Sequence, residues 1–573
     1  MTAATISRVN GPVVEVEGLE GVAMLELVEV GTASLPGEVI GLDSSRATVQ
    51  VYEYTGGLRP GEPVTRTGSP LSAELGPGLL GGVFDGMLRR LDGAGDWIQP
   101  GFSSGTLPGE RRWPFVPVAR PGSDVGPGTL LATIAGAVAI EHRVLVPPGI
   151  SGRLEWIIPA GEIAVHERVA VIGDRTLTLA ERWPVRRPRP AAERLHASVP
   201  LVTGQRVLDV LYPIARGSTA AVPGGFGTGK TVLLQQIAKW CDADVIVYVG
   251  CGERGNEMAD VLEDLAGLVD PRTGLPLLER TVLVANTSNM PVLAREASIH
   301  TGVTVAEYFR DMGYDAVLIA DSTSRWAEAL REVASRTDQL PAEEGYPAGL
   351  ASELAAFYER AGRVRTLHGD EASVTILGAV SPPGGDLSEP VSAHTRRFTR
   401  CTWSLDRDLA YARHYPAVSW RDSSSRDAAA IADWHFLRHE SGWAERRERT
   451  LALLAEADRL EAIAQLVGAR SMPDAERIVL LAGRLIRGAA LEQSALSDND
   501  AYCEPSKQTA LFQLVLDVYD RCRELLDRGV TASAIEDFDF SDVVRARDVT
   551  PPDGAAEVEA VLRRLTPGLG ALA

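Results

Sequence analysis

Eight consecutive residues of this 573-residue chain match the pattern G-x-x-x-x-G-K-[ST], namely Gly224, Gly225, Phe226, Gly227, Thr228, Gly229, Lys230 and Thr231. In such a loop, glycines let successive backbone N–H groups point at phosphate oxygens, and the following helix adds positive potential. The lysine can reach the outer phosphates, and the threonine hydroxyl can bind Mg²⁺. A strand-like segment ends in Pro223 and a helical pattern begins at Val232. This context predicts a phosphate-binding loop rather than a chance glycine turn.

Two acidic residues follow apolar segments that are typical of buried strands. Segment 244–249 leads into Glu253 and Arg254, and segment 316–320 is followed directly by Asp321. Ligands of open α/β sheets bind at the carboxyl ends of strands. Glu253 could polarise an attacking water there, with Arg254 as a compensating charge, and Asp321 could hold Mg²⁺ through water. From position alone, Glu253 could equally be an exposed acid in a turn, and Asp321 could cap a helix.

Two further features leave their roles open. Arg325 lies four residues after Asp321 and could face the site or support a helix. Segment 381–386, Ser-Pro-Pro-Gly-Gly-Asp, could line a nucleotide cleft, form a subunit contact or be a plain turn.

The sequence patterns before and after these residues predict a multidomain fold. Short alternating segments in residues 1–70 predict an N-terminal β-barrel, and residues 71–110 form a connector rich in Gly, Leu and Pro. Residues 111–185 predict a second β-rich module, which the resemblance described below matches to an insertion. Residues 195–430 alternate strand and helix patterns, which indicates a parallel sheet with crossover helices, and residues 431–573 predict a C-terminal helical domain.

A proline-rich segment joins the insertion to the α/β domain. Residues 182–190 read Arg-Trp-Pro-Val-Arg-Arg-Pro-Arg-Pro, which predicts a stiff linker. Its arginines could form a nucleic-acid patch, but a short run between prolines is more typical of a solvated connector.

Composition narrows the class of function. The net charge of −20 argues against nonspecific nucleic-acid binding and against docking on an anionic membrane surface. The five cysteines show no CxxC spacing, which argues against a disulfide framework or a zinc site. We see no signal peptide and no apolar run of about 20 residues. We therefore expect a cytoplasmic protein that other subunits hold at any membrane.

Several strings, in the same order, resemble the catalytic A subunits of V/A-type ATPases and ATP synthases. They include Gly11-Pro-Val-Val, Gly204-Gln-Arg, Gly252-Glu-Arg-Gly-Asn-Glu, Ala320-Asp-Ser-Thr-Ser-Arg and Ser381-Pro-Pro-Gly-Gly-Asp. The resemblance covers nearly the whole chain. It implies a RecA-like core for residues 195–430 and matches residues 111–185 to the insertion peculiar to A subunits. The intact phosphate loop distinguishes the chain from noncatalytic B subunits.

The resemblance also implies an activity and roles for individual residues. The enzyme would interconvert ATP and ADP plus phosphate, coupled to proton or sodium transport through rotation of a central stalk. Lys230 and Thr231 would bind the phosphates and Mg²⁺, and Asp321 would help to hold Mg²⁺ through water. Glu253 would activate the hydrolytic water and Arg254 would contact the γ-phosphate. Tyr415 would stack on adenine, although it could also be a core tyrosine.

The partners follow from the same resemblance. A subunits alternate with noncatalytic B subunits in a six-membered ring, and a B subunit donates an arginine to the site. Central-stalk and peripheral-stalk subunits complete the assembly, which reaches the ion-translocating membrane sector only indirectly. The chain would therefore lie at the inner face of the cell membrane, with no nucleic acid as partner.

Three positions depart from the family pattern. Gly225 stands where Pro or Ala is common, which predicts a more flexible loop. Thr228 replaces the cysteine of eukaryotic relatives, so a disulfide switch through the loop is not available. Leu496 falls where an aromatic residue commonly closes the adenine pocket, which leaves the far wall of that pocket undefined.

Two rival functions use the same kind of core. A hexameric nucleic-acid-translocating ATPase would be more basic than this chain. A regulatory protein that binds ATP without hydrolysing it would not need Lys230, Thr231, Glu253 and Asp321 together.

Overall fold

A computed structural model describes residues 4–43, 46–91, 105–134, 140–270, 272–336, 340–440 and 442–572. The chain divides into two compact units. Unit 1 comprises residues 1–196, 243–380 and 388–398, and unit 2 comprises residues 197–242, 381–387 and 399–573. The division runs through the predicted 195–430 domain. Residues 92–104 of the predicted connector lie outside the described residues.

Unit 1 begins with a six-stranded antiparallel sheet in the order β1-β2-β5-β4-β3-β6. Alternate apolar side chains such as Val14, Val16 and Val28 are fully buried inside it. A bridge from Thr5 to Pro63 joins β1 to the segment before β6, so the sheet curls toward closure. The strands are β1 (Thr5–Asn10), β2 (Val13–Glu17), β3 (Glu26–Val30), β4 (Leu35–Leu42), β5 (Arg46–Val51) and β6 (Val64–Pro70).

The β-rich insertion of unit 1 contains two four-stranded sheets, in the orders β10-β13-β15-β16 and β12-β11-β9-β14. Beside it, β7 (Ser72–Leu75) pairs with β17 (Glu181–Pro184), so chain segments on both sides of the insertion form one ribbon. The insertion strands are β9 (Arg112–Pro117), β10 (Asp124–Val125), β11 (Leu130–Ile134), β12 (His142–Leu145), β13 (Gly152–Ile157), β14 (Gly161–Ala164), β15 (Ala170–Ile172) and β16 (Arg175–Leu177).

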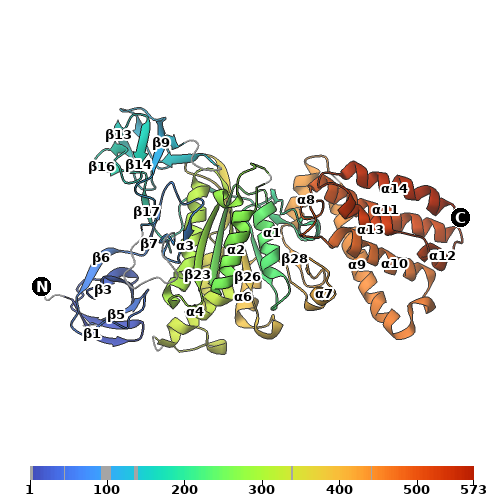
Figure 1. Cartoon of the computed structure of the whole chain (residues 1–573), viewed down its shortest axis with the longest axis horizontal. Helices are drawn as coiled ribbons and strands as arrows, with labels where there is room; N and C mark the ends of the chain where they lie inside the picture. Colours follow the sequence, from blue (N-terminus) through green and yellow to red (C-terminus); the bar gives the residue numbers. More distant parts are fainter. Residues whose placement is uncertain are drawn as a thin grey trace. The chain divides into compact units, whose positions relative to one another are not determined.

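The α/β part of unit 1 has a parallel sheet with the strand order β8-β23-β22-β24-β26. Figure 1 labels β23 and β26 of this sheet, with helices such as α3 beside them. The central strands are buried on both faces, as the near-continuous apolar segments predict. The strands are β8 (Val83–Phe84), β22 (Val245–Glu253), β23 (Thr281–Thr287), β24 (Asp315–Asp321) and β26 (Glu371–Val380), with β25 (Gly362–Arg365) antiparallel to β26 and β18 (Glu193–Leu195) antiparallel to β25. The helices are α2 (Gly255–Gly267), α3 (Val292–Asp311), α4 (Thr323–Arg336), α5 (Leu350–Tyr358) and α6 (Pro390–Phe398).

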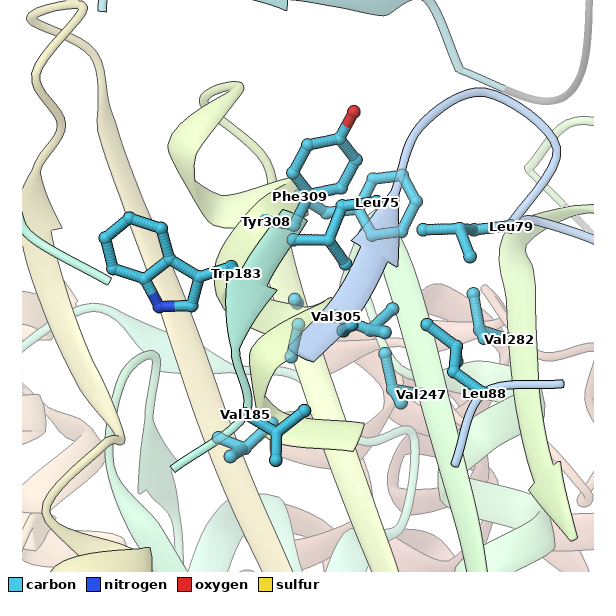
Figure 2. Close-up of a cluster of buried hydrophobic side chains, with 14 of the residues drawn as sticks. Leu75, Leu79, Leu88, Trp183, Val185, Val247, Val282, Val305, Tyr308 and Phe309 are labelled. Atoms are coloured by element: carbon cyan, nitrogen blue, oxygen red, sulfur yellow. The ribbon is translucent and has the colours of Figure 1, made fainter. Parts of the chain in front are cut away.

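Helix α3 is buried along almost its whole length and forms the centre of the unit 1 core. Figure 2 shows Val305, Tyr308 and Phe309 of α3 in one cluster with side chains from β7, β17, β22 and β23. The same helix therefore packs against the sheet that carries Glu253 and against the ribbon at the base of the insertion.

Two linker arginines, Arg186 and Arg189, are paired with carboxylates inside unit 1, so the prediction of a solvated connector was wrong for them, whereas Arg182 and Arg187 are exposed as predicted. Arg186 pairs with Glu38 of β4 at 3.0 Å and with Glu296 of α3 at 2.7 Å. Arg189, nearly fully buried, pairs with Glu181 at 3.1 Å and Asp311 at 2.7 Å. The linker is held against α3 because buried arginines need carboxylate partners, and α3 supplies them.

Unit 2 joins the phosphate loop to the helical part of the chain. Strand β21 (Thr219–Pro223) pairs in parallel with β27 (Cys401–Thr402), which pairs with β28 (Ser424–Ser425). Two short strands, β19 (Pro200–Leu201) and β20 (Ile214–Ala215), also pair. The helices are α1 (Lys230–Trp240), α7 (Arg407–Tyr411), α8 (Ala428–Phe436), α9 (Gly442–Val467), α10 (Asp474–Leu485), α11 (Pro505–Asp527), α12 (Ala532–Glu536), α13 (Ser541–Val549) and α14 (Ala555–Gly570). Within the described ranges, no helix is both long and apolar enough to cross a membrane.

Candidate functional site

The phosphate loop has the strand–loop–helix geometry that its sequence predicts. All five residues of β21 are buried, and α1 begins at Lys230 directly after Gly229. Gly229 has a φ of +81°, a conformation that favours glycine, and it turns the chain into the helix. Inside the loop, the Thr228 hydroxyl donates to the carbonyl of Gly225 at 2.9 Å. The buried strand and the first turn of α1 thus fix both ends of the loop.

Lys230 lies across the loop rather than pointing into solvent. Its ammonium group donates to the carbonyl of Gly224 at 3.1 Å and to the hydroxyl of Ser381. The sequence left the role of segment 381–386 open, and the structure brings its first residue to the phosphate-loop lysine. An ammonium group held this way at a helix N-terminus suits a phosphate oxygen.

Tyr415 lies beside the end of the loop. A Cβ atom on Gly229 would lie 3.4 Å from Cε1 of Tyr415, so the ring packs against the loop backbone. The tyrosine is 42% exposed, which does not fit a core residue and leaves ring surface for a stacking ligand. By contrast, Leu496 is 99% exposed. Leucine offers no aromatic face, and the structure gives it no role as a pocket wall.

Glu253 ends the buried strand β22 in unit 1 and is half-buried. Burial raises the pKa of its carboxyl group to about 8, and the negative charges of Asp321 and Glu257 add to the rise, whereas the Arg325 guanidinium opposes it. The backbone carbonyl of Glu253 accepts a hydrogen bond from Ser288 at 2.8 Å. A carboxyl group with a pKa near neutrality suits general-base catalysis.

The position directly before Glu253, residue 252, accepts only glycine without strain. Its φ is +73°, and a Cβ atom there would lie 2.9 Å from Cδ of Arg295 and 3.0 Å from Cβ of Arg325. Arg295 also donates to the carbonyl of Ser288 at 2.9 Å. Arg295, which lies in α3, was not identified from the sequence, since its hydrogen-bond partner is the backbone carbonyl of Ser288 in another segment.

Asp321 ends β24, the strand next to β22, and its register partner is Gly250. It is 4% exposed, and one carboxylate oxygen accepts a hydrogen bond from the Tyr248 hydroxyl at 2.9 Å. Neighbouring parallel strands therefore bring Glu253 and Asp321 to one edge of the sheet, as the sequence predicts. The tyrosine that orients Asp321 was not identified from the sequence.

The two arginines near Glu253 face different surroundings. Arg254 has a side chain that is 71% exposed, with its Nε 4.0 Å from Glu257. The Arg325 side chain is 48% exposed and pairs with Glu328 at 3.0 Å on the same helix. Arg254 thus has freedom to reach a ligand, while Arg325 acts on Glu253 through its charge.

Two of the predicted site residues carry oxygen ligands of the kind that Mg²⁺ binds. Thr231 offers a hydroxyl in the exposed first turn of α1, and Asp321 offers an oriented carboxylate. Among the described residues, no group of three or more His, Cys, Asp and Glu side chains could hold a metal ion. Mg²⁺ in nucleotide sites takes one or two protein oxygens and completes its coordination with phosphates and water, so each of these two oxygens, considered within its own unit, is of the kind that Mg²⁺ prefers.

Together, the fold and the loop define a phosphate-loop nucleotide-binding protein. Four family models then match the chain in order. They are the ATP synthase alpha/beta family β-barrel domain (residues 6–68), the ATPsynthase alpha/beta subunit barrel-sandwich domain (105–186), the ATP synthase alpha/beta family nucleotide-binding domain (204–425) and the C-terminal domain of V and A type ATP synthase (432–535). These matches confirm the predicted multidomain fold class.

Comparison with individual relatives places the chain more closely within this family. The A subunit of the A-type ATP synthase of Methanopyrus kandleri is 50% identical over 96% of this chain and 95% of its own length. The V-type ATP synthase alpha chain of Halothermothrix orenii is 48% identical over 95% of this chain and 94% of its own length. The chain therefore belongs to the ATP synthase alpha/beta family, within the group of A subunits of A- and V-type ATP synthases.

A solved structure supports the fold alone. The ATPase EscN from the enteropathogenic E. coli type III secretion system aligns with 90% of this chain and 100% of its own, with a TM-score of 0.65 and 21% identity. The similarity supports the RecA-like core that the resemblance implied.

Proposed function

We propose that this chain is the catalytic subunit of a rotary V/A-type ATP synthase, which interconverts ATP and ADP plus phosphate and couples that reaction to transport of protons or sodium ions. The observation that carries this function is an intact phosphate loop in a chain about 50% identical to A subunits over nearly its whole length. Binding of ATP and ADP follows from the family.

The phosphate loop of unit 2 would bind the nucleotide. Backbone N–H groups of residues 224–229 and the Lys230 ammonium would bind the phosphates. The exposed ring of Tyr415 would stack on adenine. Mg²⁺, when bound, would neutralise charge on the phosphate oxygens, with Thr231 as a ligand and Asp321 holding it through water.

Glu253 would orient and deprotonate the water that attacks the γ-phosphate. Its raised pKa supports this role, because a base with a pKa near the working pH combines a useful ionised fraction with strong proton affinity. Arg254, which is exposed in the single chain, would contact the γ-phosphate. In the direction of synthesis, the same carboxyl group would give the proton to the phosphate oxygen that leaves as water.

The chain would act as part of an assembly. We infer that it alternates with noncatalytic B subunits in a ring, and that an arginine of the neighbouring B subunit completes the site. Stalk subunits would connect the ring to a membrane sector, which would place the chain at the inner face of the cell membrane. Closure and opening of the helical part of unit 2 would turn the central stalk.

The rival functions find less support. The matches to A subunits and the net charge of −20 do not favour a nucleic-acid-translocating motor. A purely regulatory nucleotide-binding protein would have no need of a carboxyl group with the perturbed pKa of Glu253.

The test is Glu253→Gln in the assembled complex, with Glu263→Gln as a matched control on the exposed side of α2. Glutamine keeps the shape of the side chain but cannot take a proton, so nucleotide binding should persist while single-turnover hydrolysis falls by at least about 100-fold. The control should hydrolyse ATP at the wild-type rate. Undiminished hydrolysis by Glu253→Gln would refute the assignment of the base.

A further inference from the structure

The backbone of Tyr415 is held by a residue that lies far along the chain. The N–H of Gln493 donates to the carbonyl of Tyr415 at 2.7 Å. Gln493 is 3% exposed and follows the short helix η6 (Ile486–Leu491). The residue that would stack on adenine is therefore attached directly to the helical part of unit 2.

The side chain of Gln493 is anchored in turn. Its Oε1 accepts a hydrogen bond from the N–H of Arg206 at 2.9 Å, and its Nε2 donates to the carbonyl of Gly204 at 2.8 Å. These partners belong to the Gly204-Gln-Arg turn before the short helix η1 (Val207–Leu211), a motif to which the proposed function gives no role. A buried amide with matched donor and acceptor fixes the position of its own backbone.

A buried ion pair also links the Gly204–Arg206 turn to Asp500, near the C-terminal end of the loop formed by residues 492–503. Arg206 is fully buried and pairs with Asp500 at 2.6 Å, and its Nε donates to the carbonyl of Ala490 at 2.8 Å. The second oxygen of Asp500 accepts from Arg547 of α13 at 2.7 Å. Buried charges tolerate little displacement, because each must keep its partners. The loop is thus fixed at both ends.

We propose that Gln493 is a positioning residue of the nucleotide site: its side chain fastens loop 492–503 to the Gly204–Arg206 turn, and its backbone amide sets Tyr415 against the phosphate loop. The Arg206–Asp500 pair extends this connection to α13. The inference rests on the proposed stacking of Tyr415 on adenine. Because Leu496 offers no aromatic surface, base recognition depends on the placement of Tyr415.

The test compares base-dependent and base-independent binding in the assembled complex. Gln493→Met keeps the side-chain volume but removes both hydrogen-bonding groups, and should raise KM for ATP about fivefold. Tyr415→Ala should raise it about tenfold by removing the stacking surface. Since both changes act through one ring, the double variant should match Tyr415→Ala alone. Inhibition by tripolyphosphate, which has no base, should change less than about twofold in each variant.

Gln508→Met provides the matched control. Gln508 is also 3% exposed, and its Nε2 donates to Asp209 and to the carbonyl of Cys503, each at 2.8 Å, at the end of loop 492–503 opposite to Gln493. The Gln508→Met variant should lose about as much stability as Gln493→Met but should keep the wild-type KM for ATP. If Gln493→Met does not assemble, Gln493→Glu keeps the acceptor for Arg206 and should give an intermediate KM.

The outcomes distinguish a failure of the proposed stacking by Tyr415 from a failure of the proposed positioning by Gln493. If Tyr415→Ala leaves KM for ATP unchanged, the proposed stacking itself fails. If Tyr415→Ala acts but the effects of the two substitutions multiply in the double variant, Gln493 does not work through Tyr415 and the inference is overturned. An equal loss of tripolyphosphate binding in Gln493→Met, or a raised KM in Gln508→Met, would indicate general loosening and would also overturn it.

Discussion

Replacing Glu257 by glutamine should make the assembled complex hydrolyse ATP more efficiently near neutral pH. Glu257 lies in the first turn of α2, and its negative charge helps to raise the pKa of Glu253 to about 8, together with burial and Asp321. Removing that charge should lower the pKa of Glu253 by about one unit. A general base must be ionised to act, so activity rises with pH through this pKa, and a lower pKa moves the rise to lower pH.

The size of the effect follows from the ionised fraction of Glu253. With a pKa of about 8, roughly a tenth of the carboxyl groups are ionised at pH 7, and with a pKa one unit lower about half are ionised. The value of kcat/KM at pH 7 should therefore increase about fivefold in Glu257→Gln, whereas the two enzymes should converge above about pH 9.

The assay is kcat/KM for ATP from about pH 5.5 to pH 9.5, since this parameter reports the ionisation of the free enzyme. Arg325→Met should shift the rise in the opposite direction, because the guanidinium stabilises ionised Glu253. Glu263→Gln, on the exposed side of α2, should leave the profile unchanged. A pH profile that stays in place in both Glu257→Gln and Arg325→Met would refute the electrostatic account of Glu253.

Three further substitutions test the structural support of the site. Gly252→Ala should lower kcat at least about tenfold with little change in nucleotide affinity, because its Cβ would lie 2.9 Å from Cδ of Arg295 and displace the Glu253 turn; an unchanged kcat would contradict this. Asp500→Ala should destabilise the chain by about 3 kcal/mol in denaturant titrations, because buried Arg206 loses its counter-ion. Arg186→Met should lower the midpoint of thermal unfolding, because the buried carboxylates of Glu38 and Glu296 lose their guanidinium partner; equal midpoints would show that the linker is not held by these ion pairs.

The features that sequence reasoning found are those encoded in consecutive residues. The phosphate loop occupies one short segment, and its geometry depends on its own glycines and on the strand and helix beside it. Asp321 was found because it directly follows an apolar run, and Glu253 because it comes a few residues after another; the structure shows these runs in β24 and β22. Parallel neighbouring strands then necessarily bring such residues to one edge.

The features that were left open or missed depend on distant segments. Ser381 lies 151 residues from Lys230, and no local pattern indicates that the two side chains meet. The buried arginines of the linker looked like solvated charges, because a run between prolines carries no local sign of burial. Their partners Glu296 and Asp311 lie on α3, which also carries Arg295, Glu307 and Arg310, so the sequence of that helix did not single them out either.

ATP synthesis by the assembled complex in sealed vesicles, driven by an imposed ion gradient, tests the central claim most directly. A complex with the wild-type chain should make ATP and should stop when an ionophore dissipates the gradient. A complex with Glu253→Gln should assemble and bind nucleotide but make no ATP above the ionophore background. Synthesis at the wild-type rate by the Glu253→Gln complex would show that the chemistry takes place elsewhere.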